Sequence, residues 1–194
     1  MADAVALPRP PGVIRRFFRV HPRVTDAIVA AVYLGWSALA SIGRADGPQV
    51  WVIVVLALLG AALLLFRRTR PVLVFGVANA LFLVSAVVDS SGESLLPLLA
   101  IYAVAVHRSS RAAWGCFGVG AAVAVVYGGL VATGLRIEPL FTTAAEASVW
   151  PGAWGTWASG TVPTIVVLLV ATLIGTNVGG RVRYVAAILD RAAR

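Results

Sequence analysis

Apolar residues fall into six runs along the chain, separated by short segments that carry most of the charge. A membrane-spanning helix needs about 20 predominantly apolar residues, with a range of about 17–25. Five of the runs reach or approach this length, and the fourth does not. The pattern therefore predicts six candidate spans, at Val24–Ile42, Val50–Phe66, Pro71–Val88, Leu95–His107, Ala112–Gly134 and Trp157–Thr176.

The fourth run, Leu95–His107, decides on which side of the membrane the C-terminal segment lies. Extended to Gly92–Arg108, it covers about 25 Å at 1.5 Å per residue. That is a few ångströms less than the roughly 30 Å of a hydrocarbon core. Arg108 can snorkel and the bilayer can thin locally at modest cost. Length alone therefore leaves both crossing and turning back open.

The arginines favour crossing. All basic residues of the chain are arginines, and with six crossings 14 of the 16 lie on one side. Without the fourth crossing, nine lie on one side and seven on the other. Because short cytoplasmic loops carry an excess of Lys and Arg, we expect six crossings with both termini in the cytoplasm. The inner set would be Arg9, Arg15, Arg16, Arg19, Arg23, Arg67, Arg68, Arg70, Arg108, Arg111, Arg181, Arg183, Arg191 and Arg194, and the outer set Arg44 and Arg136.

The composition supports an all-α integral membrane protein, a six-helix bundle. Hydrophobic residues make up 60% of the chain and charged residues 12%, whereas soluble domains have about 45–50% and about 25%. A net charge of +8 is also typical of nucleic-acid binding, but the arginines cluster at the ends of the apolar runs. We therefore expect the lipid bilayer, and not nucleic acid, as the partner. The single Cys116 and two isolated histidines predict no metal site and no cofactor.

Three segments differ in character. Residues 1–23 form a basic arm expected in the cytoplasm, in which Arg15, Arg16 and Phe17 suit an anchor on anionic lipid. Residues 24–176 hold the six spans. Residues 177–194 predict the start of a cytoplasmic helix.

Few polar residues lie within the spans, and each has two interpretations. Asp26 lies close to Arg23 and is expected to pair with it or to face headgroups. Asn79, near the middle of the third span, suits either an interhelical hydrogen bond or a contact to a ligand. A small transporter or channel would need more such residues around a midplane cavity.

Trp150, Trp154 and Trp157 occur at i, i+4 and i+7, which places them on one face of a helix. They form either an aromatic belt that anchors the sixth span or part of a stimulus site. With Asn79, they are the candidate stimulus-binding residues.

The C-terminal segment combines a glycine pair with an apolar pattern. Gly179–Gly180 predicts a break or flexible joint. Val182, Val185, Leu189 and Ala192 then follow the 3-4-3 spacing of a coiled-coil seam. The seam is under two heptads, so we interpret it as the first turns of a helix that continues, and its four residues as candidates for signal transmission.

Three segments carry a family resemblance: "RRTRPVL", "PLLAIYAVAVHRSSRAAW" and "GGRVRYVAAILDRAAR". They are similar to the N-terminal membrane region of bacterial sensor histidine kinases, in the subgroup of nitrate- and membrane-fluidity-sensing kinases. In that family the last helix continues into a dimerising hairpin with the phosphorylated histidine, followed by an ATP-binding domain. The chain stops at Arg194, before both, so no catalytic residue can be carried over.

The resemblance implies an input module in the bacterial cell membrane. A homodimer would form through the C-terminal helix, and a kinase core or response regulator would be reached only through a longer chain. Kinase activity would likewise belong to a longer protein. The alternative is a stand-alone small membrane protein, such as a transporter or channel.

Overall fold

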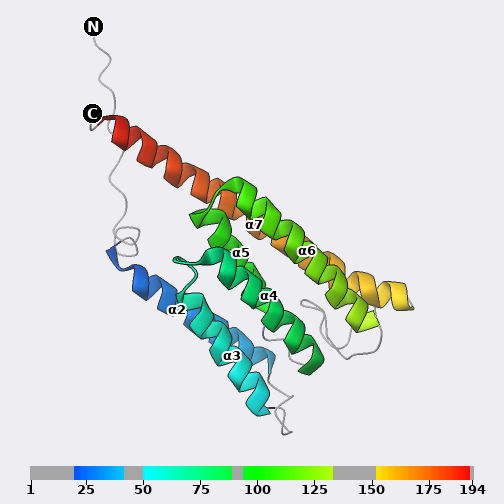
Figure 1. Ribbon diagram of the computed structural model, residues 1–194. Helices are drawn as coiled ribbons and strands as arrows, with labels where there is room; N and C mark the ends of the chain where they lie inside the picture. The colour runs from blue at the N-terminus through cyan, green and yellow to red at the C-terminus, as the bar shows by residue number, and fades with distance from the viewer. Residues whose placement is uncertain (1–19, 42–49, 89–93, 133–151, 193–194) are drawn as a thin grey trace.

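The computed structural model describes residues 20–41, 50–88, 94–132 and 152–192, and within these ranges every regular element is a helix (Figure 1). The all-α prediction is confirmed, and the first five helices begin and end within two residues of the predicted runs. The helices are α2 (Pro22–Ala40), α3 (Val50–Leu65), α4 (Pro71–Val88), α5 (Leu95–His107), α6 (Ser110–Ala132) and α7 (Ala153–Ala192).

The last helix differs most from the prediction. α7 is one α-helix of 40 residues that includes the predicted span Trp157–Thr176 and continues through Gly179–Gly180. The predicted break at this glycine pair is therefore wrong, and a flexible joint there stays a prediction. A glycine costs a helix about 1 kcal/mol relative to alanine, but this cost is opposed by packing, because Gly179 lies directly against the backbone of α5.

Three helices are long and apolar enough to cross a membrane, at Pro22–Ala40, Ser110–Leu130 and Trp157–Ile188. The other three apolar segments, Val50–Leu65, Pro71–Ser85 and Leu95–His107, are shorter. These helices agree with the membrane protein that the composition predicts.

The short helix α5 occupies the centre of the arrangement. It packs against α7, α4 and α6, and also contacts α2 and α3. Seven of its 13 residues are buried, among them Leu96, Ile101 and Val104. Figure 1 shows α6 and α7 side by side along one flank of the bundle and the α2–α3 pair along the other. α5 therefore connects the two flanks.

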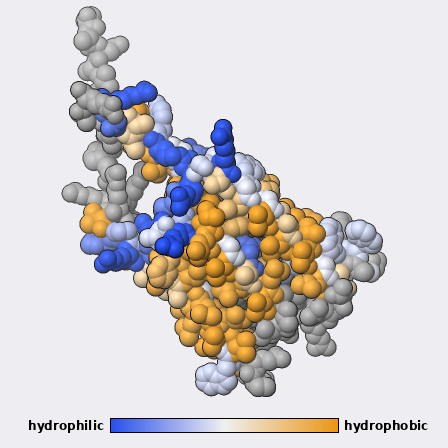
Figure 2. All heavy atoms as spheres, in the orientation of Figure 1, coloured by the Kyte–Doolittle hydropathy of each residue, from blue (hydrophilic) through white to orange (hydrophobic). Residues whose placement is uncertain are grey.

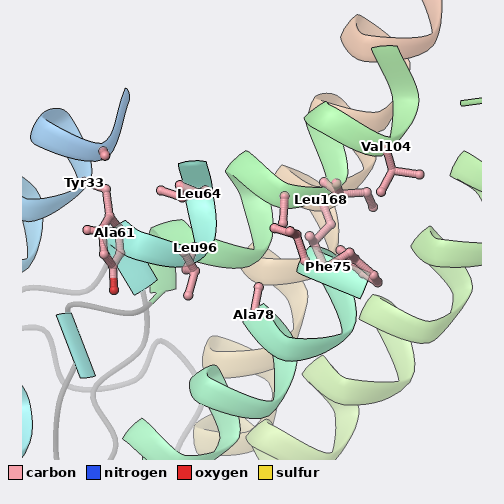
Figure 3. Close-up of a cluster of buried hydrophobic side chains, with 12 residues drawn as sticks. Tyr33, Ala61, Leu64, Phe75, Ala78, Leu96, Val104 and Leu168 are labelled. Carbon is pink, nitrogen blue, oxygen red and sulfur yellow. The ribbon is translucent and has the colours of Figure 1, made fainter. Parts of the chain in front are cut away.

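The main hydrophobic cluster follows this arrangement (Figure 3). Tyr33 of α2 and Leu64 of α3 lie at one side of the cluster, and Leu168 of α7 lies at the other. Val74 and Phe75 of α4 belong to the same cluster, together with residues of α5. Small residues such as Ala78 and Ala100, both fully buried, let the helices approach closely.

Much of the surface is apolar, and several polar side chains are buried beside the hydrophobic cluster. Large apolar side chains point outward along several helices, and Figure 2 shows hydrophobic atoms over most of the visible described surface. Polar side chains, by contrast, are buried: Asn79, Ser85, Thr161, Thr164 and Thr172 are at most 6% exposed. Water-soluble monomers rarely expose such continuous apolar area, so this distribution fits a chain surrounded by lipid.

Candidate functional site

The start of α2 is joined to the α3–α4 turn by a buried ionic cluster. The Asp26 carboxylate accepts a hydrogen bond from Arg67 Nε at 2.9 Å and lies 2.8 Å from Arg67 Nη2. Arg68 Nε lies 2.9 and 2.8 Å from the two carboxylate oxygens. The side chains of Asp26 and Arg67 are each only 10% exposed. The prediction that Asp26 pairs with Arg23 is thus wrong, because its partners are Arg67 and Arg68.

A second contact joins the C-terminal part of α7 to the α5–α6 turn. Arg183 donates from Nη1 to the carbonyl oxygen of Arg108 at 2.9 Å. This carbonyl is exposed because α5 ends at His107 and Arg108 is extended, with φ −119° and ψ −176°. The C-terminus of a helix also carries partial negative charge, which favours a cation there. This hydrogen bond therefore links α7 to the C-terminal end of α5.

The two contacts lie at the same end of the bundle. We call it the arginine end: the start of α2, the α3–α4 turn, the α5–α6 turn with the first turn of α6, and α7 from residue 181 on. Every arginine among the described residues lies there. Figure 2 shows the hydrophilic atoms gathered at the upper left, where Figure 1 places the start of α2 and the end of α7.

Just inside the arginine end, two glycines let α7 lie against the backbone of α5. A Cβ at Gly175 would come within 2.6 Å of Ala105 Cβ, and one at Gly179 within 2.8 Å of the Ala105 carbonyl oxygen. Both glycines are buried. We call Gly175 and Gly179 the glycine seat. Any larger residue at either position would push the two helices apart.

A similar close approach joins α7 to α6 near the other end. A Cβ at Gly128 would collide with Thr161 Oγ1 and come within 3.0 Å of the Trp157 carbonyl oxygen. Thr161 Oγ1 donates to the Ala124 carbonyl oxygen at 3.3 Å. The spacing of Ala124 and Gly128 is typical of close helix packing, and the structure places both at this contact.

Beyond the glycine seat, α7 carries exposed apolar side chains. Val182 is 56% exposed, Val185 52% and Ile188 47%. Figure 1 shows that this part of α7 extends past the ends of the neighbouring helices. Leu189 and Ala192 lie on the same helix, but their side chains are outside the described set. The role of Val182, Val185, Leu189 and Ala192 in transmission stays a prediction.

The candidate stimulus residues do not form one site. Asn79 is 5% exposed, and its Nδ2 donates to the Phe75 carbonyl oxygen at 2.8 Å, within α4 rather than between helices. Trp154 and Trp157 pack edge to face at the start of α7, with ring centroids 5.8 Å apart. Trp154 is 79% exposed. Trp150 lies outside the described residues.

The ionic cluster, the Arg183–Arg108 contact and the glycine seat were not singled out by sequence reasoning. Each joins residues that are far apart in the sequence. In the part of the chain that the structure describes, His, Cys, Asp and Glu side chains form no group of three that could hold a metal ion.

A family described as "Domain of unknown function (DUF7134)" matches residues 14–181. The chain belongs to this family. No curated protein and no solved structure matches the chain. The DUF7134 match includes the ionic cluster and the glycine seat, and it ends two residues before Arg183.

Proposed function

We propose that this DUF7134 chain is the membrane-embedded input module of a sensor histidine kinase. The observation that carries the proposal is the unbroken helix α7, which packs against α5 and α6 and then continues past them. At 1.5 Å per residue its 40 residues cover about 60 Å. A hydrocarbon core is about 30 Å thick, so a large part of α7 would project into water.

In the proposed topology the chain crosses the bilayer six times. The arginine end would face the cytoplasm, because short cytoplasmic loops carry the Lys and Arg excess. α3 and α5 have 16 and 13 residues, or about 24 and 20 Å. The central position of α5 supports its crossing, since backbone at membrane depth is tolerated where it is buried in protein.

The contacts of α7 suggest how a stimulus would be passed on. A stimulus would have to bind two packing arrangements of the bundle with different affinity. α7 lies on α5 through the glycine seat and on α6 through Gly128, and interlocked contacts of this kind favour discrete arrangements over gradual ones. A rotation or slide of α7 would then move Val182 and Val185 together with the rest of the helix.

The exposed apolar residues of the tail support a homodimer. Val182 and Val185 are three residues apart, as a and d positions are in a coiled coil. The same segment of a second copy would cover them. A dimerising hairpin and a kinase core would follow in a longer chain, and a response regulator would be reached through them.

Phase-shifting insertions test this proposal. Residues 1–194 would be fused to the catalytic core of a sensor kinase, and one to seven alanines inserted after Arg191. Each residue rotates the following helix by about 100°, so we expect autophosphorylation to change at least fivefold with one or two residues and to return with seven. The same insertions before residue 20 serve as the control. Autophosphorylation that does not change with the number of inserted alanines would overturn the proposal.

A further inference from the structure

A cavity of about 290 Å³ lies between the last turns of α2 and the first turns of α3, at the end of the bundle opposite the arginine end. Its walls include Leu34, Ser37 and Ala38 of α2 and Ile53, Val54 and Ala57 of α3. All nine lining residues are uncharged, and only two of them, both serines, are polar. Ala38 and Val54 are exposed, so the cavity opens at the surface of the helix pair.

Ser37 is one of the residues that line this cavity, and its hydroxyl group has no hydrogen-bond partner among the described residues. The residue is 2% exposed, and its Oγ is buried. Its carbonyl oxygen, by contrast, accepts from Ser41 Oγ at 2.7 Å. A buried hydroxyl without a partner is destabilising. A buried polar group without a partner needs a physical explanation. A ligand whose polar atom bonds to the hydroxyl would provide one.

We propose that the cavity binds an uncharged amphiphile whose hydroxyl or carbonyl oxygen forms a hydrogen bond with Ser37 Oγ. An apolar cavity of about 150 Å³ holds benzene, so this one has room for roughly twelve non-hydrogen atoms. A charged ligand would find no counter-charge among the lining residues and would lose its hydration. A medium-chain or aromatic alcohol is uncharged and carries one hydroxyl group on an apolar body of suitable size. Its apolar part would lie against Leu34, Ile53 and Ala57.

A bound molecule would lie next to the main hydrophobic cluster. Tyr33 of that cluster is four residues before Ser37 on α2, and its ring lies against Gly60, three residues after Ala57 on α3. A ligand in the cavity therefore adjoins the contact that sets the spacing of the two helices. The site is inferred without reference to the sensor function, and its test needs no kinase.

Photolabelling of the complete chain in lipid nanodiscs tests the site. The probe is 3-azioctanol, a photoreactive eight-carbon alcohol, and its adducts are mapped by mass spectrometry. We expect saturable adducts within residues 34–41 and 50–58, with at least fivefold competition by unlabelled 1-octanol. Adducts spread over the lipid-facing surface, without saturation, would show only partition into the bilayer and would overturn the proposal.

Two variants separate a defined site from general adsorption. Ala38→Trp fills the mouth of the cavity and should reduce labelling at least fivefold, whereas Ala31→Trp, the same change at an exposed position of α2 outside the cavity, should leave it unchanged. Equal labelling of the two variants would contradict the site.

The role of Ser37 is tested with a second probe, the diazirine of octane, which has no hydroxyl. Ser37→Ala should reduce labelling by the alcohol at least threefold and leave labelling by the hydrocarbon unchanged. This comparison also tests whether the cavity is a defined binding site if the Ala38→Trp variant does not fold. Equal loss for both probes, or no loss for either, would refute the hydrogen bond. Kinase output of the fusion is measured separately, so the two proposals can fail independently.

Discussion

Arg183 of α7 donates a hydrogen bond from Nη1 to the carbonyl oxygen of Arg108, at 2.9 Å, across 75 residues of sequence. This contact joins the start of the projecting part of α7 to the turn between α5 and α6. It lies one turn beyond Gly179, where α7 touches the backbone of α5. Two neighbouring contacts therefore hold α7 just before its projecting part: close packing at Gly179 and the Arg183 hydrogen bond.

The arginine contact should restrict the motion of the tail. We predict that Arg183→Ala increases the mobility of a spin label attached at Ala187→Cys, in a Cys116→Ser background, as measured by electron paramagnetic resonance. Arg181→Ala is the control, because it removes an exposed arginine of the same helix two residues earlier. Equal mobility in the two variants would mean that the hydrogen bond does not hold the tail.

The ionic cluster should contribute more to stability than any exposed charge. Removing one partner of a buried ion pair costs about 3–5 kcal/mol, because the other charge stays buried and unpaired. Arg67→Ala removes two contacts to Asp26 but leaves the carboxylate paired with Arg68, so we expect it to lower the free energy of unfolding by less than this, about 1.5–3 kcal/mol. Unfolding by a denaturing detergent would measure this change.

Arg23→Ala is the matched control for the ionic cluster. Arg23 is exposed and is close to Asp26 in sequence, so its removal should change stability by no more than about 0.5 kcal/mol. A larger loss for Arg23→Ala than for Arg67→Ala would contradict the assignment of partners.

Gly179 and Gly180 should respond to the same substitution with opposite signs. A Cβ at Gly179 would approach the Ala105 carbonyl oxygen to 2.8 Å, whereas one at Gly180 would meet nothing within 4 Å. We expect Gly179→Ala to destabilise the bundle by about 1–3 kcal/mol through overpacking. Gly180→Ala should stabilise α7 by up to about 1 kcal/mol through helix propensity.

Unfolding measurements on the two alanine variants distinguish this account from a flexible joint. If the glycine pair were a hinge, both substitutions would stiffen it and both would stabilise the helix. Stabilisation by Gly179→Ala would therefore show that α7 does not rest on α5 at this point.

The helices were predictable because their signals are local. The apolar runs are bounded by charged residues, glycines and prolines, and these limits agree with the ends of the first five helices, including the short run Leu95–His107. The seam positions Val182 and Val185 could also be read from spacing, and the structure leaves both exposed.

The contacts between helices were not predictable in the same way. Asp26 is three residues from Arg23 in sequence, yet it pairs with arginines 41 and 42 residues away. From the sequence alone, Gly179–Gly180 suggests a helix break. The sequence does not show that Gly179 packs against the backbone of α5. The cavity beside Ser37 likewise depends on how α2 and α3 pack against each other.

The central claim is that α7 carries a signal to the cytoplasmic side. A cysteine at Ala187, introduced into a Cys116→Ser background, tests it directly with a membrane-impermeant maleimide on intact cells. Trp154→Cys, at the exposed start of α7, is the control for the outer side. We predict rapid labelling at 154 and labelling at 187 only after permeabilisation. Labelling at 187 in intact cells would place the tail outside and contradict the account.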